Sequence, residues 1–507
     1  MSKSRNIIDR TIGFFNPVAG IKRAEARKLY NRYTAALPAN PHTKKRNPRS
    51  TQTANQLNKD AKTLMQRARH MDENNPFVTA ILDELCANVV GANGIMVEPQ
   101  PLDKNGEVHV EFAQAITKWF ELYSLNQNID GELSRAETEW LCARTWLRDG
   151  EVFGRMYSGY IQGVEYPTKT PFAIQPFEPD FIPYHISEPE RGQLEGITRN
   201  KLGQAISYLI QKNSLGFDFV EVDAEQMLHL KFTRRLHQNR GVSLLHSTLD
   251  LIADLEDYDQ SERISAQIAS RFSYFIKRDA AGGNDGGDTL ERDGDLFLGM
   301  GNSFELAPGE DAGIIESNRK ESMSSPFRES QMRLASSASG VNNSAVTRHY
   351  DGSYSAQRQE LVDSFARYRI LQRKFVTSWT RPLYRKALQI ALLNGELRVP
   401  KEVDKDTILN AIYQAPVMPW IDPAKEMVGI EKGTRLGLNS LSSYQRERNI
   451  NPLATRREIQ AERTAMNDMN IVSTADPANN VASEIQYSSE NDESKKSKIR
   501  YEGGDDA

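Results

Sequence analysis

The chain has 507 residues, 38% of them hydrophobic, and a formal net charge of −4 at neutral pH. This length allows two to four structural units, and the charge argues against a protein that coats polyanions over its whole surface. The two cysteines, Cys86 and Cys142, lie in apolar helical patterns, which predicts buried free thiols rather than a disulfide. No apolar run approaches the roughly 18 residues of a membrane helix, and the first residues lack the apolar core of a secretory signal. We therefore expect a soluble protein with no membrane partner, made in a reducing cytoplasm.

The first half of the chain predicts an arm followed by a mixed body. Residues 1–60 turn polar and basic after a short apolar patch, a composition typical of an extended arm. In residues 61–242, helices with aromatic residues at core spacing give way to short strands separated by Pro and Gly. Asn75 and Pro76 have the capping chemistry of a helix start. The fold class that follows is α+β.

A long acidic helix is expected next, over residues 243–277. Apolar residues such as Leu249 and Leu255 recur at helical spacing, and the helix would be about 50 Å long. Its other face carries Asp250, Asp254 and Asp257, with Arg263 as the main compensation on the helix itself. Like charges four residues apart cost a few tenths of a kcal/mol, so this acidic face favours a surface that repels a polyanion or meets a basic partner.

Residues 278–323 combine a Gly- and Asp-rich loop with short strands, which predicts a small β unit. The loop resembles a calcium loop in composition but lacks the acidic spacing and terminal Glu of an EF-hand, so we expect no metal there. Residues 324–338 predict a short helix. The loop at 339–352 has Gly near each end and no apolar period. It exposes polar side chains as the tip of an arm: Asn342, Asn343, Arg348 and His349.

A second long helix is predicted to open residues 353–424, with a kink at Pro382, because proline removes a donor and clashes with the preceding turn. Residues 425–472 read as further helices. Residues 473–507 are rich in Ser, Asn, Glu, Asp and Lys, a composition that indicates disorder.

Motifs of catalysis do not occur in the sequence: there is no phosphate-binding loop, HExxH, GxSxG elbow or paired-Cys motif. His229, between two leucines of a predicted strand, favours a packing role over that of a ligand or base. We expect no enzyme, no catalytic residue, no metal and no cofactor.

The order and spacing of several segments resemble the portal proteins of lambda-like tailed bacteriophages, over about residues 60–465. These segments are Arg69-His-Met-Asp-Glu-Asn-Asn75, Arg240-Gly-Val-Ser-Leu-Leu245, Tyr354-Ser-Ala-Gln-Arg358 and Trp420-Ile-Asp-Pro-Ala-Lys-Glu426. The resemblance implies the phage portal fold, assembling as a ring, usually a dodecamer. The implied parts are an N-terminal arm (1–60), wing (61–242), stem helices (243–277 and 324–338), clip (278–323), tunnel loop (339–352), long kinked helix with wing return (353–424), crown (425–472) and tail (473–507).

The resemblance further implies a place in the virion, at one capsid vertex, after synthesis in the host bacterial cytoplasm. Double-stranded DNA would pass through the axial channel without sequence recognition during packaging and ejection. The implied partners are further copies of the chain, the large terminase subunit, the major capsid and scaffold proteins, and head-completion or tail connector proteins. Two alternatives stay open from the residues alone: a phage DNA-processing enzyme with a metal-binding acidic cluster, and a monomeric adaptor.

Overall fold

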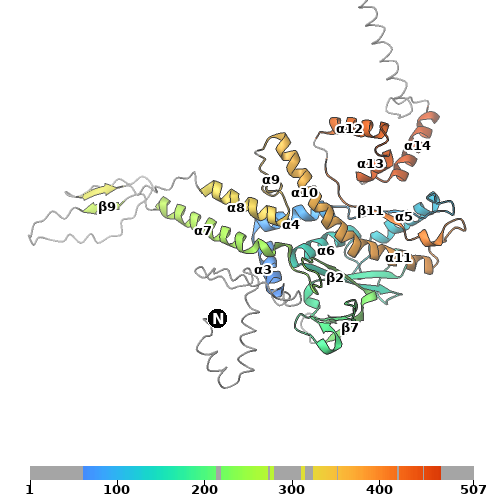
Figure 1. The fold of residues 1–507 in the computed structure, drawn as a ribbon, viewed down its shortest axis with the longest axis horizontal. Helices are drawn as coiled ribbons and strands as arrows, with labels where there is room; N and C mark the ends of the chain where they lie inside the picture. The colour runs from blue at the N-terminus through green and yellow to red at the C-terminus, as the bar shows by residue number, and fades with distance from the viewer. Residues whose placement is uncertain are drawn as a thin grey trace, which may run out of the picture. The chain divides into compact units, whose positions relative to one another are not determined.

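The computed structural model of the protein describes residues 61–212, 218–271, 275–278, 310–313, 324–350, 352–419, 422–448 and 450–469 (Figure 1). The predicted N-terminal arm and tail, and most of the predicted clip, lie outside the described residues. The fold is α+β, as expected from the sequence, and Cys86 and Cys142 are buried free thiols, also as expected. Among the described helices, none is both long and apolar enough to cross a membrane.

The chain forms two compact units, and it passes from one to the other within α4, α6, β2, β3 and α10. The residues of the predicted wing fall into both of them. Of the described residues, the first unit comprises those up to Leu85, Arg144–Phe153 and those between Phe177 and Arg367, and the second comprises Cys86–Ala143, Gly154–Pro176 and those from Tyr368 onwards.

The first unit contains an antiparallel sheet of four strands in the order β4-β5-β6-β7, and β8 lies beside β2 in a second sheet. Alternate side chains of these strands pack with Phe153, Ile182 and Met227 into one apolar core, as expected where a sheet has one buried face. The strands are β2 (Glu151–Ser158), β4 (Gln193–Leu194), β5 (Ile197–Arg199), β6 (Ala205–Gln211), β7 (Phe219–Asp223) and β8 (Met227–Lys231).

Helices form the rest of the first unit, and α7 runs alongside α8 (Figure 1). Leu249, Ile252 and Leu255 are buried, which confirms the predicted apolar face of the acidic helix. Ser243 caps the start: its side chain accepts a hydrogen bond from the Leu245 N–H at 3.1 Å. The helices, of which α4, α6 and α10 continue into the second unit, are α3 (Ala61–Asn74), α4 (Pro76–Val89), α6 (Arg135–Asp149), the 3-10 turn η6 (Leu244–Ser247), α7 (Leu249–Arg271), α8 (Ser324–Ser339), α9 (Asn343–Thr347) and α10 (Tyr354–Phe375).

After α7, the structure describes one antiparallel strand pair, β9 (Phe275–Arg278) with β10 (Glu310–Gly313). The register runs from Phe275 opposite Gly313 to Arg278 opposite Glu310. Only Arg278 of β9 lies in the predicted clip. The expected end of the long helix at residue 277 is wrong, because α7 ends at Arg271 and residues 275–277 form a strand. Phe275 and Ile276 are aromatic and β-branched residues, which favour strands.

The interruption expected near Pro382 takes the form of a π-turn, η8 (Val376–Thr380), between α10 and α11 (Arg381–Leu393). The Arg381 N–H donates to the Val376 carbonyl, five residues back instead of four. The ring of Pro382 would clash with a carbonyl in a regular preceding turn, and the wider turn gives it room.

The second unit joins β1 (Met96–Pro99) and β11 (Ala411–Gln414) in an antiparallel pair, while β3 (Phe172–Phe177) lies beside β2. An aromatic core fills this unit, in which Phe120 meets Tyr384 edge to face at 5.2 Å. Glu98 of β1 is buried and accepts hydrogen bonds from Arg446, which ties the predicted crown to this strand. The remaining helices are α5 (Val110–Ser124), α12 (Pro423–Arg435), α13 (Leu441–Glu447) and α14 (Pro452–Asp468).

Candidate functional site

The loop between α8 and α10 divides into a tied base and an exposed tip. Gly340 ends α8 in the left-handed region, at φ 84°, where glycine has no steric penalty. The loop then forms the short helix α9, where the sequence predicts irregular structure. The apolar side chains of Val341 and Val346 are buried and fix this turn to the unit.

Side-chain hydrogen bonds connect the loop base to both flanking helices. The Ser364 hydroxyl of α10 donates to Asn342 Oδ1 at 2.6 Å, and the Ser344 hydroxyl donates to Glu360 Oε2 of α10 at 2.6 Å. Ser336 of α8 lies 3.4 Å from Asn343 Oδ1. Asn342 and Asn343, two of the four predicted loop residues, therefore face their own unit and hold the base in place.

The other two predicted residues, Arg348 and His349, are exposed and form the tip together with Tyr350. Arg348 ends α9 with φ 57° and ψ 24°, a left-handed conformation that is uncommon for a residue with a side chain. Among the described residues, no carboxylate forms an ion pair with Arg348. The tip thus presents a cation and an imidazole on a short turn whose base is fixed.

The predicted acidic face lies on α7, next to α8. Asp254 and Asp257 are exposed. Asp250 is half-buried and forms an ion pair with Arg67 of α3 at 3.0 Å. The negative charge of Asp250 is therefore balanced by a cation from another helix, which the sequence of α7 alone could not indicate. The structure places these three carboxylates on one helix.

A buried ionic centre precedes α7 and fixes where this helix begins. Glu151 and Arg240 are both fully buried, and Arg240 Nε donates to Glu151 Oε1 at 2.6 Å. The other oxygen, Oε2, accepts from the Gly241 N–H at 2.7 Å and from His229 Nε2 at 3.0 Å. The Tyr184 hydroxyl completes the set at 2.9 Å from Oε1.

Every guanidinium nitrogen of Arg240 has a hydrogen-bond acceptor. Its terminal nitrogens donate to the carbonyl oxygens of Pro179, Ile182 and Glu195 at 3.0–3.3 Å, and its guanidinium lies 3.7 Å from the centre of the Tyr184 ring. A buried charge is tolerated only with such complete pairing. The first residue of the motif Arg240–Leu245 is thus neutralised by Glu151, which lies 89 residues earlier in the chain.

The pKa values in this centre follow from burial and pairing. Burial alone would raise the pKa of Glu151, but Arg240 and the hydrogen bonds from His229 and Gly241 lower it to about 2. Burial lowers the pKa of His229 to about 4, against the opposing effect of Glu151. His229 is therefore neutral at pH 7, donates from Nε2, and stacks on Phe153 at 4.3 Å, in agreement with the packing role expected from the sequence.

Acid should destabilise the folded protein through these two groups. Both pKa values are lower in the folded than in the unfolded state, so the unfolded chain binds more protons. The free energy of unfolding therefore decreases as the pH is lowered. The contribution of His229 is present above pH 6.5 and is lost as the pH falls towards 4. That of Glu151 is present above pH 4.5 and is lost towards pH 2.

The melting temperature of His229→Gln should vary less than that of the wild type between pH 6.5 and 4. His70→Gln, at an exposed site, should keep the wild-type slope, and equal slopes in all three proteins would contradict the assignment.

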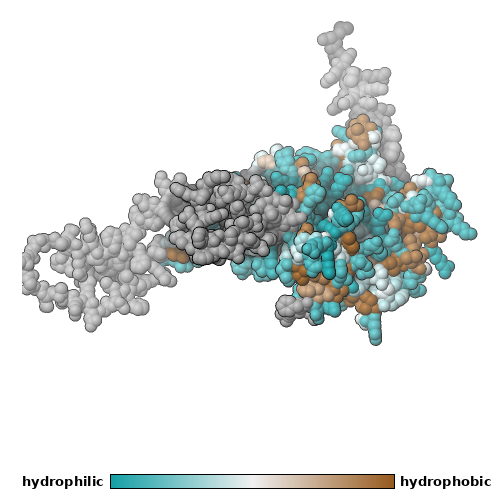
Figure 2. All heavy atoms as spheres, turned by 60° about the horizontal axis from the view of Figure 1, so that its bottom comes forward, coloured by the Kyte–Doolittle hydropathy of each residue, from teal (hydrophilic) through white to brown (hydrophobic). Residues whose placement is uncertain are grey.

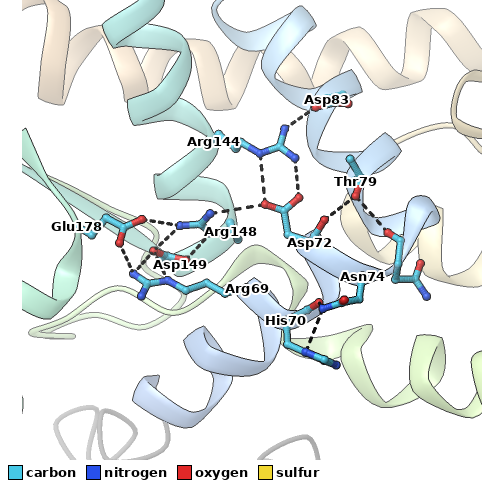
Figure 3. Close-up of polar contacts among 11 residues, drawn as sticks. Arg69, His70, Asp72, Asn74, Thr79, Asp83, Arg144, Arg148, Asp149 and Glu178 are labelled. Atoms are coloured by element: carbon cyan, nitrogen blue, oxygen red, sulfur yellow. Dashed lines mark hydrogen bonds and ion pairs between the residues drawn. The ribbon is translucent and has the colours of Figure 1, made fainter. Parts of the chain in front are cut away.

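A second ionic network lies among α3, α4 and α6, around the Arg69–Asn75 motif (Figure 3). Arg69 pairs with Asp149 at 2.7 Å and with Asp180 at 2.6 Å. Asp72 is buried and accepts from Arg144, which also pairs with Asp83 of α4. Arg69 and Asp72 of this motif therefore have a structural role: their ion pairs hold neighbouring elements together. Within the described part of the chain, no group of three or more His, Cys, Asp or Glu side chains could hold a metal.

Comparisons with known proteins identify the class to which this fold belongs. The model of the family "Phage portal protein, lambda family" matches residues 39–372. A curated relative, the probable portal protein of Halomonas phage phiHAP-1, is 24% identical over 416 residues, which cover 78% of each chain. The protein is thus of the portal class. The chain belongs to the lambda family of phage portal proteins, and the alternative of a DNA-processing enzyme has no support among the matches.

Solved structures with a similar chain come from gene transfer agent particles. One is the neck of a native GTA particle computed with C12 symmetry, at 12% identity, covering 76% of this chain and 92% of that chain, with a TM-score of 0.43. Another is the virion of a native gene transfer agent particle, at 13% identity, with the same coverage and a TM-score of 0.41.

Proposed function

We propose that copies of this chain form a closed ring, with twelve as the expected number, at one vertex of the capsid. Double-stranded DNA would pass through the central channel during packaging and ejection. Membership in the portal family supports this function. The chain has no phosphate-binding loop for nucleotide, so the packaging motor is expected to be a separate protein, the large terminase subunit, docking on the clip at 278–323.

We assign the DNA contact to the tip of the loop between α8 and α10. The observation that carries this assignment is the combination of a tied base and an exposed cation: Asn342 and Ser344 are bonded to α10, while Arg348 is exposed. In a ring, one Arg348 per subunit becomes a ring of positive charge around the axis, as in channel constrictions. Contacts with phosphates carry no sequence information, which suits DNA that must slide.

The acidic face of α7 has a complementary part in this proposal. Asp254 and Asp257 would keep phosphates from binding strongly to the stem, because like charges repel over a Debye length of about 8 Å at physiological salt. Capsid, scaffold and head-completion proteins are the further partners that we expect.

Arg348→Glu tests the assignment. The purified variant should form the same rings as wild type by negative-stain microscopy, because an exposed loop residue rarely changes stability by more than about 0.5 kcal/mol. Heads assembled with it should package or retain less full-length DNA, since a ring of carboxylates repels the phosphates. Arg191→Glu, at another exposed arginine, is the matched control and should package normally. Normal filling by the Arg348 variant would place the loop away from DNA, and a wild-type protein that stays monomeric would refute the ring.

A further inference from the structure

The helix pair α10 and α11 carries an unusual excess of positive charge. Residues 364–395 contain seven Lys and Arg residues and no Asp or Glu. Several of these cations stand four residues apart, as Arg369 and Arg373 do, and like charges at this spacing cost a few tenths of a kcal/mol per pair. Among the described residues, four exposed cations of this surface have no carboxylate partner: Arg369, Arg373, Lys374 and Arg385.

An apolar side chain lies in the middle of this charge. Ile370 is 71% exposed and has Arg369, Arg373 and Lys374 as its neighbours on α10. Figure 2 shows other places where hydrophobic residues interrupt the polar surface of the described chain. A surface for phosphates gains nothing from an exposed isoleucine, whereas a protein interface has an apolar centre inside a polar rim. The α10 ridge, defined as residues 369–374, therefore fits a partner with an apolar hollow and acidic edges.

Such a hollow exists on the first unit. A groove of about 700 Å³ lies between the start of α4, α7 and α8. Its partly exposed apolar lining includes Phe77, Tyr258 and Met332, and Glu256 and Glu262 line it as well. Two arginines, Arg263 and Arg328, also line the groove, and Arg328 is engaged by Asp259 at 3.0 Å.

We propose that the α10 ridge of one copy docks into the α7–α8 groove of a second copy. This inference rests on the proposed ring and names the surfaces that would hold it together. Ridge and groove lie on different helices, so each copy offers one of each, and a head-to-tail contact of this kind closes into a ring when the rotation fits. Ile370 would cover the apolar lining, while the ridge cations face Glu256 and Glu262. Complementary charge also opposes wrong registers, because like charges would then meet.

Charge reversal on each side tests the contact. A ridge variant carries Arg369→Glu with Arg373→Glu, and a groove variant carries Glu256→Lys with Glu262→Lys. Each alone should lose the ring species in size-exclusion chromatography with light scattering, with on the order of tenfold more protein needed to assemble. Circular dichroism should show the wild-type helix content in both. Arg398→Glu with Lys401→Glu, the same charge change at exposed sites, is the matched control and should leave assembly unchanged.

Mixing the two variants distinguishes the loss of a specific contact from misfolding of either variant. The native groove of the ridge variant meets the native ridge of the groove variant, and the two reversed surfaces also complement each other. The mixture should therefore recover rings at an equimolar ratio. Failure of the mixture to recover, or normal rings from either variant alone, overturns the proposal. If the ridge variant keeps its rings but binds a DNA duplex more weakly in a salt-dependent assay, the ridge contacts phosphates instead. A wild-type protein without rings would refute the proposed function itself.

Discussion

Replacing Arg240 by Met should lower the free energy of unfolding by about 3–5 kcal/mol, enough to leave a marginally stable subunit largely unfolded. The substitution removes the cation but leaves the Glu151 carboxylate fully buried, with only hydrogen bonds from Gly241, His229 and Tyr184 to stabilise it. Three carbonyl oxygens would also lose their donor. Soluble yield and the melting temperature by circular dichroism are the measurements.

Two further variants show whether the buried charge is the cause. Arg191→Met removes an exposed arginine that lies 3.3 Å from Glu188, and it should cost less than about 1 kcal/mol. Adding Glu151→Gln to Arg240→Met removes both charges but keeps a side-chain oxygen for the hydrogen bonds from Gly241 and His229. The double variant should recover part of the loss, because no unpaired ion stays buried. Equal effects of Arg191→Met and Arg240→Met would mean that the buried pair contributes no more than a surface pair.

Periodicity in the sequence predicted the long helices α7 and α10, and the structure confirms the burial of Leu249 and Leu255. The same reasoning treated the face of α7 as uniform, but only part of the predicted apolar stripe is covered. Ile264 is 47% exposed in the single chain. Periodicity reports which residues share a face, and it contains no information on how far the covering elements extend.

The buried centre could not be predicted in the same way. Glu151 follows Gly150 at the start of a strand and reads as an ordinary charged residue, and its partner Arg240 is 89 positions away. A single sequence contains no signal that connects them. Likewise, the polar composition at 339–352 could not separate Asn342, which is bonded to Ser364, from Arg348, which is exposed. The two valines at 341 and 346 were the available signal for the tied base, since isolated apolar residues in a polar loop can anchor it.

The largest local constraint on the start of α7 is steric, and Gly241→Ala should abolish folding or lower the melting temperature strongly. A Cβ at this position would overlap the backbone carbonyl group of Gly150, so the backbone would have to shift to accommodate it. The same carbonyl accepts a hydrogen bond from the Phe232 N–H at 2.6 Å, and the Gly241 N–H is bonded to Glu151. Any shift that accommodates the methyl group therefore strains the hydrogen bonds that position the buried centre.

Gly429→Ala provides the matched control for this substitution. Gly429 lies inside α12, and no atom outside its own helix backbone stands within 4 Å of the place that an alanine Cβ would take, so the added methyl group meets open space. Alanine is favoured over glycine in a helix interior by about 1 kcal/mol, and this variant should be as stable as wild type or slightly more stable. Soluble yield, melting temperature and ring formation should be measured for both. If Gly241→Ala folds and melts like Gly429→Ala, then the backbone at Gly150 yields easily, and the close approach does not determine where α7 begins.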